Sequence, residues 1–257
     1  MALLDVRDLR HRFGGLVALN AVTFAVPEGQ IKAVIGPNGA GKTTLFNVIS
    51  GVMRPDAGSV AFEGAQLTGL PPFRIARRGL SRTFQNVSLF LHMTVLENVM
   101  IGRHCRTRHG LFSSALRLPG QQREERAIRE AARGELAYVG LEAMADVPVS
   151  ELAFGQRRMV ELARALATQP RLLLLDEPAS GLNTRETLDL AELIRNIRDR
   201  GITVLLVEHD MSLVMDISDH ILVLHYGEPI AEGKPSEVRS NEQVIAVYLG
   251  GEFDAES

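Results

Sequence analysis

The sequence lacks the features that mark secreted and membrane-spanning chains. Its single cysteine, Cys105, excludes a disulfide within the chain. The longest apolar runs, such as residues 172–175 and 202–207, fall far short of the roughly 18 residues that a membrane-spanning helix needs. The opening MALLDVRDLR has no apolar segment of the kind found in signal peptides. We therefore expect a soluble protein inside the cell.

A large excess of charge of either sign is also missing. The formal net charge is −3 over 257 residues, which provides no global attraction to nucleic acid or to anionic lipid. A hydrophobic content of 46% is enough to bury a large core, either in one domain or in a core with a lobe. The composition thus predicts an ordinary globular protein with no nucleic-acid partner.

Short β-type runs open the chain and return in its second half, where they alternate with helical patterns. They cover residues 3–6, 22–26, 33–35, 172–175, 202–207 and 221–224. This alternation favours an α/β fold with a largely parallel central sheet. Between residues 86 and 151 the strand patterns fade, and we expect an inserted helical lobe. The expected inward stripe of this lobe consists of Ala127, Ile128, Ala131 and Leu136.

The stretch AVIGPNGAGKTTLFNVIS carries the strongest chemical signal. An apolar run leads into Gly36, four residues follow, and Gly41-Lys42-Thr43 opens a helical pattern, which is a full match to the Walker A phosphate-binding loop. Backbone N–H groups there can face an anion, Lys42 can reach the outer phosphates, and the Thr43 hydroxyl can ligate Mg²⁺. The sequence therefore predicts a nucleoside triphosphate site. Its binding residues are Gly36, Pro37, Asn38, Gly39, Ala40, Gly41, Lys42, Thr43 and Thr44.

Two carboxylates follow the four leucines of RLLLLDEP. Asp176 and Glu177 come at the C-terminal end of this expected buried strand, which is the edge where parallel sheets bind ligands. Asp176 is placed to hold Mg²⁺ directly or through water, and Glu177 to orient or deprotonate an attacking water. Asp-Glu-Pro by itself could simply end a strand, but the phosphate-binding loop makes a catalytic pair the better interpretation.

A histidine, His209, follows the strand pattern of GITVLLVEHD. A lone histidine is more often structural than functional. His209, however, comes at the end of a run that points at the same sheet edge. An imidazole there could hydrogen-bond the γ-phosphate and sense its presence.

Six motifs in a characteristic order resemble those of ABC-transporter ATPase subunits along nearly the whole chain. They are residues 36–44 as Walker A, Gln85 in RTFQN as the Q-loop, 152–156 as the signature, 172–177 as Walker B, 180–183 as the D-loop and His209 as the switch histidine. The resemblance implies a P-loop NTPase core of the RecA-like type, with an N-terminal antiparallel β subdomain and an inserted α-helical subdomain. It also implies that two subunits close head to tail, with each ATP held between the Walker A of one and the signature of the other.

Several residue roles rest on this resemblance alone. Gln85 is expected to ligate Mg²⁺ and to take part in catalysis with Lys42, Glu177 and His209. Phe13, in HRFGGLVALN, matches the position whose ring stacks on adenine, although taken alone it is better read as a core residue. The signature residues expected to face the partner's ATP are Ala153, Phe154, Gly155 and Gln156.

The resemblance also divides the chain. Residues 1–257 are expected to form a single ABC ATPase domain. Within it, residues 1–85 and 160–240 would make the nucleotide-binding α/β core, and residues 86–159 the helical subdomain that carries the signature. Residues 241–257 would form a C-terminal tail, whose polar end GGEFDAES is expected to fray.

The motifs are most similar to those of ATP-binding subunits of branched-chain amino-acid importers, of the LivG type. The stretches that carry this similarity are IARRGLSRTFQNVSLFLHMTVLENV, LAFGQRR, EPASGLN, VEHDMSLVMDISDHILVL and VIAVYLG. In that family the ATPase pairs with a second, related ATPase beneath two membrane permeases, and an external binding protein delivers leucine, isoleucine or valine. The chain would then lie at the cytoplasmic face of the inner membrane. A homodimer, and importers of urea, amides or other amino acids, remain open.

Two other functional classes are considered. A soluble ABC enzyme of translation or DNA repair usually carries two cassettes or a long coiled-coil insertion, and this chain shows neither. A non-hydrolysing, nucleotide-controlled scaffold is disfavoured because Glu177 and His209 are both present. The sequence therefore predicts a transport ATPase in preference to either class.

The signature departs from the usual Leu-Ser-Gly-Gly-Gln. Ala153 replaces the serine whose hydroxyl would reach the γ-phosphate, and Phe154 replaces the first glycine. A charge-assisted hydrogen bond of roughly 1.5–3 kcal/mol is thereby lost, whereas the Gly155 backbone N–H and the helix dipole remain. In the D-loop, Asn183 replaces the usual aspartate and Thr184 stands where proline is common. These changes predict that the two ATP sites of a heterodimer hydrolyse unequally.

Overall fold

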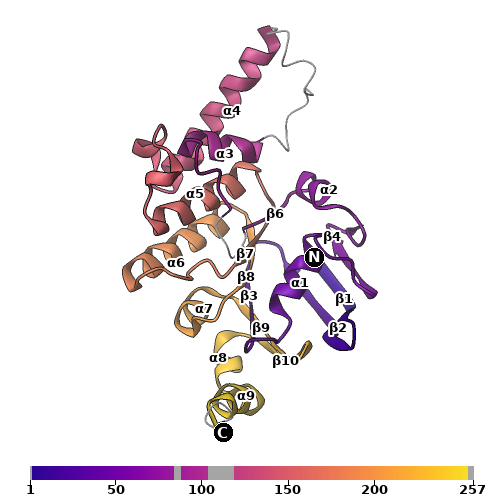
Figure 1. Ribbon diagram of the computed structural model, residues 1–257. Helices are drawn as coiled ribbons and strands as arrows, with labels where there is room; N and C mark the ends of the chain where they lie inside the picture. The colour runs from indigo at the N-terminus through magenta and orange to yellow at the C-terminus, as the bar shows by residue number, and fades with distance from the viewer. Residues whose placement is uncertain (1, 84–87, 104–118, 254–257) are drawn as a thin grey trace.

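A six-stranded sheet runs through the middle of the described molecule (Figure 1), in the order β10-β9-β3-β8-β7-β6. The structure is a computed structural model that describes residues 2–83, 88–103 and 119–253. All neighbouring strands in this sheet are parallel except β9 and β10. The strands are β3 (Ile31–Ile35), β6 (Leu80–Arg82), β7 (Leu172–Asp176), β8 (Thr203–Val207), β9 (His220–His225) and β10 (Glu228–Gly233). The expected α/β fold with a largely parallel central sheet is confirmed.

A second, antiparallel sheet is formed by the N-terminal part of the chain. Its order is β2-β1-β4-β5. The strands are β1 (Ala2–Phe13), β2 (Leu16–Pro27), β4 (Ala57–Phe62) and β5 (Ala65–Gln66). In β1, Val6 lies opposite Phe24 of β2 and Val60 of β4, and all three side chains are buried. This sheet is the N-terminal antiparallel β subdomain implied by the family resemblance.

The alternation of side chains along the central strands separates two cores. Leu172 and Leu174 of β7 face a core shared with the antiparallel sheet and α1 (Lys42–Ile49). Leu173 and Leu175 face the opposite core, which is shared with α5, α6 and α7. Figure 1 shows α1 and the antiparallel sheet on one side of the central sheet and these helices on the other. The three helices are α5 (Phe154–Ala167), α6 (Thr184–Asp199) and α7 (Met211–Ile217).

Helices α3 (Val95–Arg103), α4 (Pro119–Tyr138) and α5 enclose a third core in the helical lobe. Its buried residues include Ala132 and Leu136 of α4. The expected inward stripe is only partly correct, because Ile128 and Ala131 are half-buried and Ala127 is exposed. Figure 1 shows the reason: the N-terminal part of α4 projects beyond α3 and α5, so these two helices do not cover it.

The shorter helices lie at the edges of these layers. They are α2 (Pro72–Arg77), the 3₁₀ turns η3 (Glu142–Met144) and η4 (Val149–Glu151), α8 (Pro235–Arg239) and α9 (Glu242–Phe253). Much of the segment predicted as a C-terminal tail is therefore helical, and Val244 and Tyr248 of α9 pack against the core on the α7 side of the sheet. Within the described residues, none of the helices combines the length and apolarity needed to cross a membrane.

Candidate nucleotide site

The loop between β3 and α1 contains two positions that only glycine can occupy. Gly36 has φ 152°, and a Cβ atom built there would lie 2.1 Å from the Leu224 carbonyl oxygen. Gly41 has φ 99°, and its Cβ would lie 2.4 Å from the Ala18 carbonyl oxygen. The loop is thus wedged between β9 and β2, whereas Asn38 and Gly39 at its crest are exposed. This arrangement holds the start of α1 at the carboxyl end of the central sheet.

Lys42 is the first residue of α1, and its side chain turns back into the loop. The Nζ atom donates hydrogen bonds to the carbonyl oxygens of Gly36 (2.5 Å) and Pro37 (2.9 Å). Burial lowers the pKa of Lys42, and the charges of Glu177 and Asp176 oppose that shift. Of the hydroxyl residues that follow, Thr43 is exposed and Thr44 is half-buried. The loop therefore combines exposed backbone with a buried cation.

Asp176 ends β7 with only 2% of its surface exposed. Its Oδ2 atom accepts a hydrogen bond from Arg82 Nη2 at 2.7 Å. Its Oδ1 atom is buried and has no hydrogen-bond partner within the described part of the chain. Buried carboxylate oxygens are normally paired or coordinate a metal, so Oδ1 fits a hard divalent cation such as Mg²⁺.

Glu177 and His209 approach each other across two neighbouring strand ends. Glu177 has φ 48°, which is strained for a residue with a side chain, and its backbone N–H donates to the Val207 carbonyl oxygen at 2.9 Å. The His209 Nδ1 atom lies 4.0 Å from Glu177 Oε2. The His209 side chain is 64% exposed, so its imidazole is accessible at this sheet edge.

Glu208, beside His209, is a buried carboxylate that the motif analysis missed. Its Oε1 accepts the backbone N–H of Ala179 at 2.7 Å, and its Oε2 accepts those of His209 (3.0 Å) and Asp210 (3.4 Å). Burial raises the pKa of Glu208, and these backbone hydrogen bonds oppose the shift. The signal available in the sequence was a glutamate directly after the apolar run of β8. Glu208 ties the loop after β7 to the loop after β8.

Phe13 lies at the end of β1, in the hairpin that reaches the phosphate-binding loop through Ala18. Its side chain is 46% exposed and packs edge-on against the His11 ring, with 4.7 Å between ring centroids. The interpretation of Phe13 as a core residue is therefore wrong. An exposed ring in this hairpin suits stacking on a planar base.

The signature segment begins α5 and contacts the loop after β7. The Phe154 ring packs against Gly181, and the Gly155 backbone packs against the side chain of Glu186 at the start of α6. Ala153 is the N-cap of α5 and has no side-chain acceptor, so its position is held by a hydrogen bond from its N–H to Gln156 Oε1 at 3.0 Å. Phe154 is 48% exposed. The N–H groups of the first turn of α5 are thus presented without a capping side chain.

The D-loop substitution has a structural consequence. Asn183 is the N-cap of α6, and its Oδ1 accepts the Glu186 N–H at 3.0 Å while Glu186 Oε2 accepts the Asn183 N–H at 2.9 Å. This reciprocal capping box fixes the start of α6, and Thr184 occupies the first helical position. Asparagine therefore serves as the N-cap of this helix without a charge.

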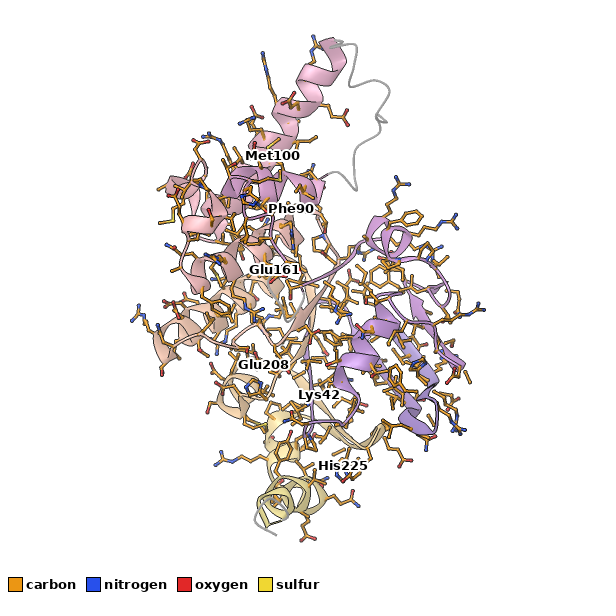
Figure 2. The ribbon with its side chains drawn as sticks, in the orientation of Figure 1. Lys42, Phe90, Met100, Glu161, Glu208 and His225 are labelled. Carbon is orange, nitrogen blue, oxygen red and sulfur yellow. The ribbon has the colours of Figure 1, made fainter. Side chains whose placement is uncertain are left out.

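The candidate residues fall into two groups in space. The carboxyl edge of the central sheet brings together Lys42, Asp176, Glu177 and His209. Figure 2 labels Lys42 and Glu208 in this central part of the molecule. The signature residues lie instead beside the start of α6. Gln85 lies outside the described residues.

Comparison with known proteins identifies the family. The model of the ABC transporter family matches residues 19–180, and that of the branched-chain amino acid ATP-binding cassette transporter matches residues 228–254. The chain belongs to the ABC transporter family. It is an ABC-type ATPase, as the recognised motifs predicted.

Two curated relatives carry names that describe their role. The chain is 47% identical over 249 residues to the high-affinity branched-chain amino acid transport ATP-binding protein BraF of Pseudomonas aeruginosa, covering 96% of this chain and 98% of that protein. It is 46% identical, with the same coverage, to the protein of that description named LivG in Escherichia coli.

A solved structure supports the fold of the ABC-type ATPase. A nucleotide-free ATP-binding cassette from an ABC transporter is 34% identical to the chain and superposes with a TM-score of 0.85, over 96% of this chain and 99% of that one. The implied ABC ATPase fold is confirmed.

Proposed function

We propose that this ABC ATPase energises the uptake of branched-chain amino acids, leucine, isoleucine and valine, through partner permeases. The observation that carries the ATPase part is the convergence of Lys42, Asp176 and Glu177 at one sheet edge, where the pKa of the lysine responds to both carboxylates. The choice of solute rests on the relatives named for branched-chain amino acid transport. An importer of urea, amides or other amino acids is the alternative.

Each residue at the sheet edge has a distinct task. The backbone of residues 36–44 and the Lys42 ammonium bind the phosphates of ATP. Asp176, Thr43 and Gln85 would hold Mg²⁺, which would supply positive charge to the phosphates during the transfer. Glu177 orients the attacking water and accepts its proton. His209 donates a hydrogen bond to the γ-phosphate and thereby senses whether the γ-phosphate is present. Phe13 stacks on the adenine.

The signature serves a second subunit. Residues 153–156 present backbone N–H groups and the positive end of the α5 dipole to an anion outside their own chain. This is the arrangement expected where two ATPases, either two related chains or two copies of this one, close head to tail over two ATP molecules. The pair would lie at the cytoplasmic face of the inner membrane, below two permease subunits that receive solute from an external binding protein.

Transport assays with the assembled complex test this function. Reconstituted in vesicles with its permeases and the binding protein, the complex should take up leucine in an ATP-dependent manner. Uptake should be lost in Lys42→Ala and retained in Ala127→Ser, an exposed position on α4. Uptake of urea or amides in place of leucine would establish the alternative importer. ATP hydrolysis with no associated permease would contradict the transport role.

A further inference from the structure

Arg82 is a buried arginine next to the nucleotide site, three residues before Gln85, to which none of the motifs assigns a role. It is the last residue of β6, the strand that pairs with β7 and lies at one edge of the central sheet. The side chain is only 5% exposed. Its Nη2 atom donates to Asp176 Oδ2 at 2.7 Å, which pairs the guanidinium directly with the carboxylate expected to hold Mg²⁺.

The other arm of the Arg82 fork is anchored on α1. Its Nη1 atom donates to Asn47 Oδ1 (2.8 Å) and to Ser50 Oγ (2.9 Å). The guanidinium also lies over the Phe46 ring, 5.7 Å from its centroid. Arg82 therefore bridges the helix that begins with Lys42 and the strand that ends with Asp176. Its planar fork suits this task, because it fixes two partners in one geometry.

The contacts of Asp176 are asymmetric. Oδ2 is held by Arg82, whereas Oδ1 is buried and has no hydrogen-bond partner within the described residues. A carboxylate held by one oxygen cannot rotate freely about its Cβ–Cγ bond, and the second oxygen is then kept in one direction. Loss of a group that orients a metal ligand in this way typically lowers metal affinity by about 10–100-fold.

We propose that Arg82 is a positioning residue for the metal site: it holds Oδ2 of Asp176 so that Oδ1 is available to Mg²⁺. This inference rests on the proposed role of Asp176 as a Mg²⁺ ligand. It assigns to Arg82 an effect on the metal, because within the described residues its guanidinium donates to Asp176 and, on α1, to Asn47 and Ser50.

Charge and orientation predict opposite effects of removing Arg82. The guanidinium is a cation beside a metal site, so its loss would strengthen the electrostatic attraction of Asp176 for Mg²⁺. Its loss would also free the carboxylate to turn away from the metal. Orientation dominates here, because Asp176 is only 2% exposed and Arg82 is the residue that holds its Oδ2. The sign of the change in metal affinity therefore decides between the two effects.

The experiment measures ADP binding to the purified full-length chain by calorimetry, with Mg²⁺ and with EDTA. The readout is the factor by which Mg²⁺ strengthens ADP binding. We expect Arg82→Met to reduce this factor by about tenfold or more, with ADP affinity in EDTA unchanged. Arg82→Lys, which keeps the charge and loses the fork, should fall between Arg82→Met and the wild type, and it provides the test if Arg82→Met does not fold.

Two further variants separate the possible causes. Lys32 is another buried cation; it pairs with Glu232 and lies near the start of β3, at the end of the strand away from the nucleotide site. Lys32→Met should lower thermal stability without changing the Mg²⁺ factor. Asp176→Asn should abolish the factor. An unchanged factor in Asp176→Asn would refute the proposed metal site itself. If Asp176→Asn abolishes the Mg²⁺ factor but both Arg82 variants keep a factor equal to or larger than that of the wild type, the metal site stands and the role of Arg82 is overturned.

Discussion

The carboxyl edge of the central sheet and the start of α5 are built in opposite ways. At the sheet edge, Lys42, Asp176 and Glu208 are buried, and each is held by hydrogen bonds to neighbouring strands or loops. At the start of α5, the N-cap Ala153 offers no acceptor and Phe154 is 48% exposed. The first region is built from buried groups that its own chain holds in place, whereas the N–H groups of the second have no capping side chain. We infer that the chain carries one preorganised half-site and one half-site that depends on a partner.

The largest expected effect distinguishes these halves directly. In a complex of two different ATPases, Glu177→Gln should reduce turnover by about 10²–10⁴-fold, because a general base of this kind contributes that much. The matching substitution in the partner should reduce turnover less, since the partner's Walker A faces the altered signature of this chain. Steady-state release of phosphate, measured for both single variants, provides the comparison. Equal losses would show that the two sites contribute equally.

Restoring the missing signature hydroxyl tests the second half. Ala153→Ser supplies an N-cap hydroxyl that can donate to the γ-phosphate of the partner's ATP, and a charge-assisted hydrogen bond of this type contributes about 1.5–3 kcal/mol. We expect ATP-dependent association of the subunits to become about tenfold tighter or more. Analytical ultracentrifugation in ATP, with Glu177→Gln present to prevent turnover, measures it.

A serine at an N-cap also stabilises its own helix, so a control is needed. Ala153→Asn supplies an N-cap acceptor as well, and both variants should raise the melting temperature in the absence of ATP. The gain in association should be larger for the serine variant, which has the hydroxyl of the usual signature. The same gain for both variants would assign the effect to helix capping rather than to phosphate recognition.

The sheet edge could be predicted because its residues are fixed by local spacing. The glycines before Lys42 and the leucines before Asp176 specify a loop and a buried strand within a few residues of the functional side chain. Local patterns also predicted the β-strands at residues 3–6, 33–35 and 172–175, and the structure contains all three. Local sequence was sufficient to predict a functional residue wherever its motif and the strand or helix that carries it are contiguous in the chain.

Arg82 and Glu208 could not be assigned in this way, because their partners are distant in sequence. The contact of Arg82 with Asp176 spans 94 residues and that of Glu208 with Ala179 spans 29 residues. Helix faces raise a similar difficulty: the period of α4 correctly indicated Leu136 as buried, but the exposure of Ala127 depends on where its neighbours α3 and α5 end. Tertiary contacts decided these positions, and the local pattern carries little information about them.

A smaller effect is expected at the D-loop. Asn183→Ala removes the cap of α6 and should lower the free energy of unfolding by about 1 kcal/mol, as measured by urea denaturation. Asn183→Asp keeps the cap and adds a negative charge at the helix N-terminus, which is favourable, so it should be at least as stable as the wild type. Equal destabilisation by both substitutions would indicate that the asparagine amide, rather than its oxygen, is required.

The smallest effect is the pH dependence that Glu208 confers on stability. Burial raises the pKa of its carboxyl above the ordinary value of 4.5, and the backbone hydrogen bonds only oppose this shift. The folded chain therefore retains this proton to a higher pH than the unfolded chain does. The contribution of Glu208 to stability is complete below the unfolded pKa and is lost as the pH rises through the folded pKa.

Substitution by glutamine removes this titration. The stability of wild type relative to Glu208→Gln should thus be greatest near pH 4 and decrease as the pH rises toward neutrality, because only the wild type must ionise a buried carboxyl. Melting temperatures of both proteins across this range measure the difference, and Glu142→Gln, at an exposed position, controls for the loss of one carboxylate. A difference that increases with pH would mean that the three backbone donors outweigh burial. The carboxylate would then stabilise the sheet edge as an anion.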